Sequence, residues 1–219
     1  MQNLSAYGEL DHIIIGVGNL EEGIKRFAQL SGCRATIGGS HPNWGTRNAL
    51  LHLDENCCLE LLAPDPKQNG LRWHPEIATF REPKIVGWAV RHELDQFAAL
   101  LYERGVPSIG PAKGSRVRQD GSILRWRTVI LRDDLKGHLP FFIEWDTYSP
   151  HPSTDSPKGC SLREFRVTGA LPEIPPLRAG MRLQPSTQEQ TQLFAKFSAA
   201  NGREFELASN PVRAAHWVI

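Results

Sequence analysis

Three side chains have the types and positions needed for acid–base or metal chemistry: His12, Glu60 and Glu144. His12 lies in an apolar run near the start of the chain, and each glutamate lies in a later apolar run. A carboxylate is costly to bury without a partner, so the same placement twice suggests a shared role. An imidazole with two carboxylates suits Zn²⁺, Fe²⁺, Mn²⁺ or Ni²⁺. If these runs are strands that border one hollow, the three groups converge there.

Each of these residues also has a structural interpretation. His12 could be a buried histidine that is bonded to the backbone. Each glutamate could form a buried salt bridge, with Arg125 or Arg127 as its partner. The residue types alone leave both interpretations open.

Other residues are candidates for binding a ligand in such a hollow. Asn48 offers both a donor and an acceptor, which suits a carbonyl or hydroxyl group. His41 and Trp44 precede it in a loop that could form a lid. Arg125 and Arg127 alternate with a tryptophan, so both point to one side of a strand. Facing the hollow, they would bind a carboxylate; facing solvent, they would have no special role.

The elements that must position these residues occur twice, in a strand, helix and three-strand order. In the first copy, apolar residues at 20–30 fall on one helical stripe between Asn19, a good N-cap, and Gly32, a good helix end. The second helix is predicted at 94–101 and stops at Gly105.

The predicted strands of the two copies have similar spacing. A single such unit leaves one sheet face uncovered, so the two units are expected to place their sheets around a common hollow with the helices outside. Asp120 and Gly121 form a hairpin-type turn signal. The strands are expected at 10–17, 34–37, 46–53 and 57–62 in the first copy, and at 84–90, 106–109, 123–131 and 139–145 in the second.

The sequence therefore predicts an α+β fold of two βαβββ modules, which form a cupped half-barrel with outer helices, followed by a C-terminal α/β extension. The expected boundaries are 1–66 and 67–148 for the modules and 149–219 for the extension. In the extension we expect strands at 162–167 and 180–183, a helix at 187–200, and short apolar pieces at 205–207 and 216–219.

Composition narrows the class of protein. The chain has 219 residues, 40% of them hydrophobic and 22% charged, with a net charge of +1. This balance gives no reason to expect nucleic acid or a membrane as partner, and no apolar run approaches the roughly 20 residues that span a bilayer. No signal peptide is visible, and the four cysteines are expected to be reduced and buried, so the protein is predicted to be cytoplasmic. Five further histidines are expected at the surface: His74, His92, His138, His151 and His216.

The strings Leu10-Asp11-His12, Leu59-Glu60-Leu61 and Phe142-Ile143-Glu144 resemble the vicinal-oxygen-chelate superfamily, the group of glyoxalase I, extradiol dioxygenases and bleomycin-resistance proteins. The resemblance covers about residues 8–147. Within the superfamily the chain is most similar to a glyoxalase-like branch. The similar segments are 41–48, 59–66, 120–126 and 139–145.

The resemblance implies a cupped half-barrel around a divalent metal, which is held by one residue from the first and last strand of each module. His12, Glu60 and Glu144 match three of these places. The fourth place falls at Ile85, or at Lys84 or Val86 if the frame slips by one residue, and none of these is a usual metal ligand. The set of metal ligands is therefore incomplete, and two alternatives stay open. Either three protein residues hold the metal, or the cup binds an organic ligand without a metal.

The first hypothesis is an enzyme, either a metal-dependent lyase or isomerase or a dioxygenase-like enzyme, that acts on a small oxygen-rich metabolite with Glu144 as general base. The alternative is a metal-free protein that binds or sequesters a small molecule. A third is a structural subunit of a dimer with vestigial sites. A small-molecule substrate or ligand is the expected partner, with a homodimer left open.

Overall fold

The computed structural model describes residues 9–41, 44–118, 120–132, 137–168, 182–184 and 190–213. The predicted apolar piece at 216–219 lies outside the described residues. The elements are β1 (Glu9–Gly16), α1 (Leu20–Ser31), β2 (Thr36–His41), β3 (Thr46–Asp54), β4 (Cys57–Pro64), η1 (Pro75–Thr79), β5 (Lys84–Arg91), α2 (Leu94–Glu103), β6 (Ser108–Val117), β7 (Ile123–Leu131), β8 (Phe141–Trp145), η2 (Pro152–Thr154), β9 (Ser161–Thr168), β10 (Arg182–Gln184), β11 (Gln190–Ser198), β12 (Glu204–Ala208) and β13 (Val212–Arg213).

The first helix forms where its capping residues predict. The side chain of Asn19 accepts a hydrogen bond from the backbone N–H of Glu22 at 3.0 Å, which satisfies one of the free donors of the first turn. Gly32 ends the helix with φ 72, a left-handed conformation that glycine adopts without steric cost. The predicted turn at Gly121 also forms, with φ 84.

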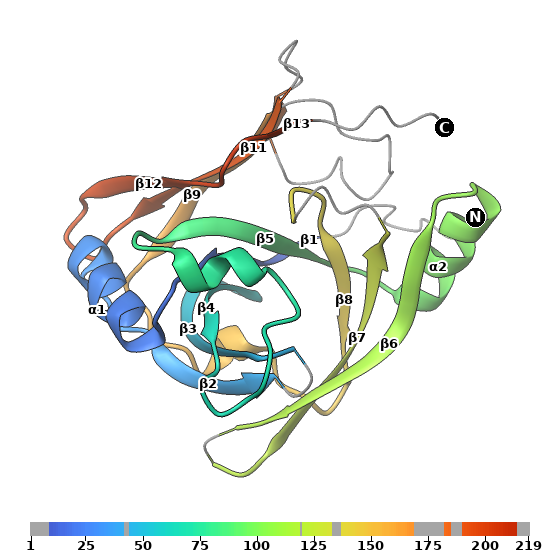
Figure 1. Cartoon of the computed structure of the whole chain (residues 1–219), viewed down its shortest axis with the longest axis horizontal. Helices are drawn as coiled ribbons and strands as arrows, with labels where there is room; N and C mark the ends of the chain where they lie inside the picture. Colours follow the sequence, from blue (N-terminus) through green and yellow to red (C-terminus); the bar gives the residue numbers. More distant parts are fainter. Residues whose placement is uncertain are drawn as a thin grey trace.

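The strands of the two copies join into one eight-stranded sheet in the order β2-β3-β4-β1-β5-β8-β7-β6. Each half repeats the same pairing: β1 is parallel to β4, and β5 is parallel to β8. The halves meet where β1 and β5 pair antiparallel. The sheet curls so far that its two end strands, β2 and β6, come into contact. The α+β half-barrel of βαβββ modules is therefore confirmed (Figure 1).

The main hydrophobic core lies on the convex side of this sheet, which faces α1, α2 and a second, five-stranded sheet with the order β10-β9-β11-β12 and β13 paired to β11 (Figure 1). Trp88 of β5 packs against Phe165 of β9, with ring centroids 5.2 Å apart. Phe27 of α1 packs against Phe197 of β11 at 6.3 Å. The extension thus contributes side chains to the same core as the modules.

The predicted helix at 187–200 is wrong, because most of this segment forms β11. Thr191, Leu193, Ala195 and Phe197 are all fully buried and alternate with less buried residues. A period of two is the signature of a strand with one covered face. The helix prediction gave weight to the apolar content of the segment and missed this alternation.

The remaining predictions on the fold have mixed outcomes. The strand predicted at 106–109 continues much further, to Val117, as β6. All four cysteines have free, buried thiols, as predicted. The division at residues 66 and 148 stays a prediction. No helix in the described part of the chain has the length and apolar character of a membrane span.

Candidate functional site

The concave side of the curled sheet encloses a cavity of about 380 Å³. Its wall is built from alternate residues of successive strands, because side chains of a strand point to opposite faces in turn. One half of the wall consists of His12 and Ile14 of β1, Thr46, Asn48 and Leu50 of β3, and Cys58, Glu60 and Leu62 of β4. The other half includes Trp126, Thr128 and Ile130 of β7 and Phe141, Ile143 and Trp145 of β8.

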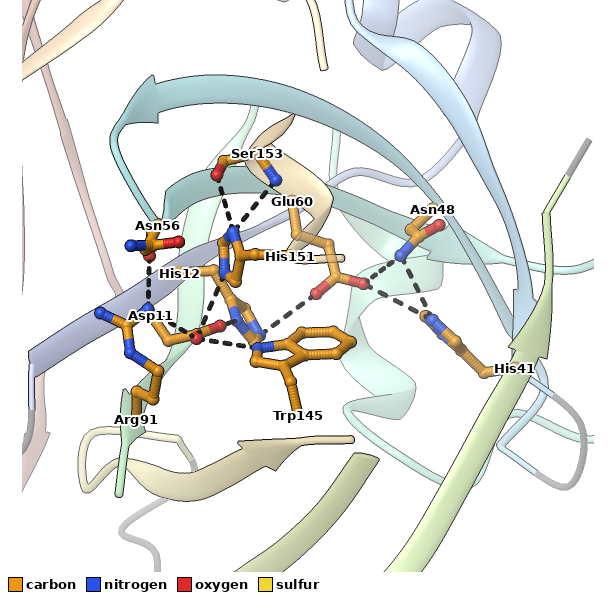
Figure 2. Close-up of polar contacts among 10 residues, drawn as sticks. All are labelled: Asp11, His12, His41, Asn48, Asn56, Glu60, Arg91, Trp145, His151 and Ser153. Atoms are coloured by element: carbon orange, nitrogen blue, oxygen red, sulfur yellow. Dashed lines mark hydrogen bonds and ion pairs between the residues drawn. The ribbon is translucent and has the colours of Figure 1, made fainter. Parts of the chain in front are cut away.

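Two of the predicted metal ligands, His12 and Glu60, face each other in this cavity. Nε2 of His12 lies 3.6 Å from Oε2 of Glu60 (Figure 2). The other carboxylate oxygen, Oε1, accepts a hydrogen bond from Nδ2 of Asn48 at 2.7 Å and lies 3.7 Å from Nε2 of His41. Asn48, His41 and Trp44 line the same cavity, so the structure brings five predicted site residues together.

Asp11, the residue before His12, contacts the histidine ring although strand alternation predicts opposite faces for the two side chains. The pairing of β1 with β5 shifts register between Leu10 and His12, which makes Asp11 the extra residue of a β-bulge. A bulge re-aims a side chain without ending the strand. As a result, Nδ1 of His12 donates a hydrogen bond to Oδ1 of Asp11 at 2.6 Å.

The carboxylate of Asp11 is fully buried and has several partners besides His12 (Figure 2). Nε1 of Trp145 donates to its Oδ2 at 2.9 Å, Nε2 of His151 lies 3.2 Å from the same oxygen, and Nη1 of Arg91 lies at 3.5 Å. Burial by itself would raise the pKa of Asp11, but the two histidine rings outweigh it and hold that pKa well below the ordinary value. Asp11 is therefore ionised throughout the neutral range.

The two cavity histidines titrate in opposite directions. Burial opposes the charge of His12, but the hydrogen bond to Asp11 and the charges of Asp11 and Glu60 raise its pKa above the ordinary value. Burial lowers the pKa of His41, and its Nε2 lies 3.2 Å from Nδ2 of Asn48, as an acceptor would. The environment of His12 thus strengthens its hold on a proton relative to an ordinary histidine, and that of His41 weakens it.

Glu144 lies on the other face of the sheet. Its Oε2 accepts a hydrogen bond from Nη2 of Arg127 at 2.6 Å and one from the backbone N–H of Leu94 at 3.2 Å. Arg127 also donates to both carboxylate oxygens of Asp95, at 2.7 and 3.1 Å. Glu144 therefore anchors the first turn of α2, where a negative charge is favourable.

The expected convergence of Glu144 with His12 and Glu60 is thus corrected. On β8 the cavity-facing position is Ile143, one residue earlier. A difference of one residue moves a strand side chain to the opposite face. The structural interpretation, a salt bridge to Arg127, is the one that the contacts of Glu144 support.

Arg125 and Arg127 also face away from the cavity, and Trp126 between them lines it. Their predicted role in binding a ligand in the cavity is corrected for the same reason of alternation. The arginine that does line the cavity is Arg116 of β6. Sequence reasoning missed it because strand β6 was predicted to end at residue 109. A longer strand would have placed the small residues Ala112 and Gly114 on the same side as Arg116.

Three of the histidines that were expected at the surface are buried, and His92 is half-buried. His74, His138 and His151 are 7%, 3% and 9% exposed, respectively. His216 lies outside the described residues. His151 caps η2 by accepting a hydrogen bond from the backbone N–H of Ser153, and its Nε2 lies 3.2 Å from Oδ2 of Asp11.

The donor set does not fit a divalent metal. In the described ranges no group of three or more His, Cys, Asp or Glu is placed to hold one. Oε1 of Glu60 already accepts a hydrogen bond from Asn48. The guanidinium of Arg116 is close enough to interact electrostatically with Glu60, and a positive charge beside a carboxylate opposes a second cation there.

Comparisons with known proteins agree with this architecture. A hypothetical protein from Staphylococcus aureus superposes with a TM-score of 0.60 at 17% identity, over 93% of this chain and 87% of that chain. Methylmalonyl-CoA epimerase from Mycobacterium tuberculosis gives a TM-score of 0.45 at 22% identity, over 70% of this chain and 95% of that chain. The likeness to the Staphylococcus aureus protein shows the fold alone. No curated protein matches the chain by sequence.

The sequence itself matches a family profile described as a glyoxalase-like domain, over residues 10–174. This range contains nearly all of both modules, the whole of β9 and every described residue of the cavity wall. The chain therefore belongs to the glyoxalase-like domain family, within the vicinal-oxygen-chelate superfamily.

Proposed function

We propose that the protein catalyses proton transfer on a small oxygen-rich metabolite bound in the cavity, with Glu60 as the base and His12 as the acid, and without a metal ion. The observation that carries this proposal is the continuous series Asp11–His12–Glu60, which ends at the cavity wall with spacings of 2.6 and 3.6 Å. A carboxylate base and an imidazole acid that face each other in one cavity are the parts that proton transfer requires.

The geometry suggests a division of labour. The carboxylate of Glu60 would take a proton from a carbon next to a carbonyl group. The imidazolium of His12, with Nε2 on the cavity side, would donate a hydrogen bond to the oxygen on which the negative charge develops. Return of the proton to the other face or to a neighbouring carbon gives an isomer, and loss of a leaving group gives an elimination product. Isomerase or lyase chemistry is therefore expected.

Asp11 and Asn48 would act as positioning residues. Asp11 accepts the Nδ1 proton of His12, which directs Nε2 toward the cavity and stabilises the imidazolium. Asn48 holds one oxygen of Glu60 and leaves the other free to meet a substrate proton. His41 favours the neutral form, so it keeps Asn48 in place without adding a second positive charge.

Two measurements test the proposal. The chelator-treated protein is incubated in D₂O with a panel of 2-oxo acids, 2-hydroxy acids and thioesters, and loss of C–H signals is followed by proton NMR. We expect exchange on at least one compound, and its loss in Glu60→Gln and His12→Asn. Elemental analysis of protein purified without chelator is expected to show no stoichiometric metal. One bound equivalent that His12→Ala removes would contradict the metal-free mechanism.

A second candidate function is sequestration of a small molecule. The aromatic part of the cavity wall favours it, because flat rings supply stacking surface. The aromatic residues whose rings can line the cavity are Trp44, Trp73, Trp126, Phe141 and Trp145. Tight binding of a ligand that wild-type protein leaves chemically unchanged, with equal affinity in Glu60→Gln, would favour this function over catalysis.

A further inference from the structure

Arg116 is the most unusual charged residue of the cavity. Its side chain is only 6% exposed and lines the cavity wall. Among the described residues its guanidinium makes no hydrogen bond and no ion pair. Two other arginines of the sheet have such partners: Arg91 donates to the backbone of Asn56 at 2.9 Å, and Arg127 donates to Glu144. A buried guanidinium without a partner is costly, so its retention points to a partner that binds from outside the chain.

The surrounding backbone leaves room for this side chain. Arg116 extends from β6 toward β2, where the curled sheet brings its two end strands into contact. A Cβ atom at Gly38 of β2 would lie 2.9 Å from Nη1 of Arg116 and 2.4 Å from Oδ1 of Asn48. No larger residue fits there without displacing both groups. Oδ1 of Asn48 is itself buried without a hydrogen bond.

The charges around Arg116 do not neutralise it through contact. The opposing charge that acts on it most strongly is Glu60, while Arg118 adds a like charge. Arg116 and Glu60 form no ion pair, so they lie more than 4 Å apart. Glu60 is already engaged by Asn48 and faces His12. The guanidinium therefore keeps its donors available to the cavity while remaining close to the carboxylate that we propose as the base.

We infer that Arg116 binds the carboxylate group of the cavity's ligand and that this ligand carries a flat, unsaturated body. The inference rests on the proposed function in so far as the same cavity holds the ligand. The planar guanidinium matches a carboxylate with two parallel hydrogen bonds. The indole of Trp126 flanks the strand that carries Arg116: a Cβ at Gly114 would lie 2.4 Å from its Nε1. A cavity of about 380 Å³ is within the usual range for small ligands.

The test compares benzoate with its uncharged analogue benzamide, using tryptophan fluorescence and calorimetry on the full chain. Wild-type protein is expected to bind benzoate at least about tenfold more tightly, the preference that a charge-assisted hydrogen bond confers. Arg116→Met is expected to lose this preference and Arg116→Lys to keep part of it. Arg125→Gln, on the outer face of the neighbouring strand β7, is the matched control and is expected to behave as wild type.

Thermal unfolding separates a binding role from a structural one. Removal of an unpartnered buried charge is expected to leave the midpoint of Arg116→Met unchanged or raise it. The inference is overturned if wild-type protein shows no preference for benzoate, if Arg116→Met retains the preference, or if this variant loses thermal stability as a structural arginine would. Glu60→Gln is expected to keep the preference for benzoate. Absence of proton exchange together with a normal preference would therefore reject the proposed chemistry and leave the role of Arg116 intact.

Discussion

The central feature at the residue scale is the β-bulge in β1, which turns the side chain of Asp11 toward the ring of His12. Without the bulge, the two side chains would point to opposite faces of the sheet, and the histidine would lose its buried carboxylate. Because the bulge turns Asp11 toward the ring, the cavity gains a histidine whose Nδ1 is fixed and whose Nε2 meets Glu60. Acid–base character thus arises from local backbone geometry.

Asp11→Asn is expected to lower the pKa of His12. The amide accepts a hydrogen bond but carries no charge, so burial then opposes the imidazolium without a compensating carboxylate. The pKa should fall from above the ordinary histidine value to that value or below it. A titration of the His12 ring signals by NMR measures this. Glu9→Gln, which removes an exposed carboxylate that pairs with Arg91, should leave the pKa of His12 unchanged; an unshifted His12 in Asp11→Asn would contradict the dyad.

The predicted site residues fall into two groups, according to the face of the sheet that each side chain occupies. His12, Glu60, Asn48, His41 and Trp44 were predicted correctly as neighbours, because strand alternation and loop order place them on one face. The three others, Glu144, Arg125 and Arg127, lie on the opposite face. A glutamate in an apolar strand does not reveal which face it occupies, since that depends on pairing with a distant strand. For Glu144 the contact that marks the outer face is its salt bridge to Arg127.

At the scale of elements, Asp11 connects four parts of the chain. Its carboxylate joins β1 to Arg91 of β5, Trp145 of β8 and His151 before η2. These contacts cross the boundary between the two modules and hold the end of β8 against β1. Loss of the charge should therefore weaken the packing of elements far apart in the sequence.

Asp11→Asn is expected to reduce the free energy of unfolding by about 3–5 kcal/mol, the usual cost of breaking a buried charge pair. The pKa of Asp11 is lowered on folding, so its contribution is present above the unfolded value of about 4 and lost as the pH falls through the folded value. The pKa of His12 is raised, so its contribution is complete below about pH 6.5 and lost as the pH rises through the folded value.

The difference between wild type and Asp11→Asn should consequently be largest between about pH 4 and pH 6.5. It should narrow on both sides of this window. Urea denaturation of both proteins across the pH range measures the difference. A difference that is independent of pH would mean that the two groups do not titrate as a pair.

At the scale of the whole molecule, the paired modules follow from the repeated sequence pattern, and the second sheet does not. The repeat in helix caps, strand spacing and turn signals was sufficient to predict the curled sheet and its cavity. The extension has no second copy for comparison, and the apolar content of β11 is compatible with a helix until its period is examined. A non-local partner, the pairing of β11 with β9, determines its structure.

Phe197→Ala is expected to destabilise the whole protein by about 3–5 kcal/mol, because a fully buried aromatic side chain leaves a cavity. Its ring stacks on Phe205 at 5.3 Å and packs against Phe27 of α1. Phe194→Ala, on the more exposed face of the same strand, should cost distinctly less. Thermal unfolding should show one transition in all three proteins. A separate early transition in Phe197→Ala alone would mean that the second sheet unfolds independently of the modules.

The proposed function requires that Glu60, the glutamate in the cavity, moves the protons. A comparison of two single substitutions tests this most directly. The measurement is the rate of solvent deuterium exchange into a cavity ligand by chelator-treated Glu60→Gln and Glu144→Gln. We predict that Glu60→Gln abolishes the exchange and that Glu144→Gln, which alters only the anchor of α2, retains most of it. Loss of exchange in Glu144→Gln with activity preserved in Glu60→Gln would contradict the account.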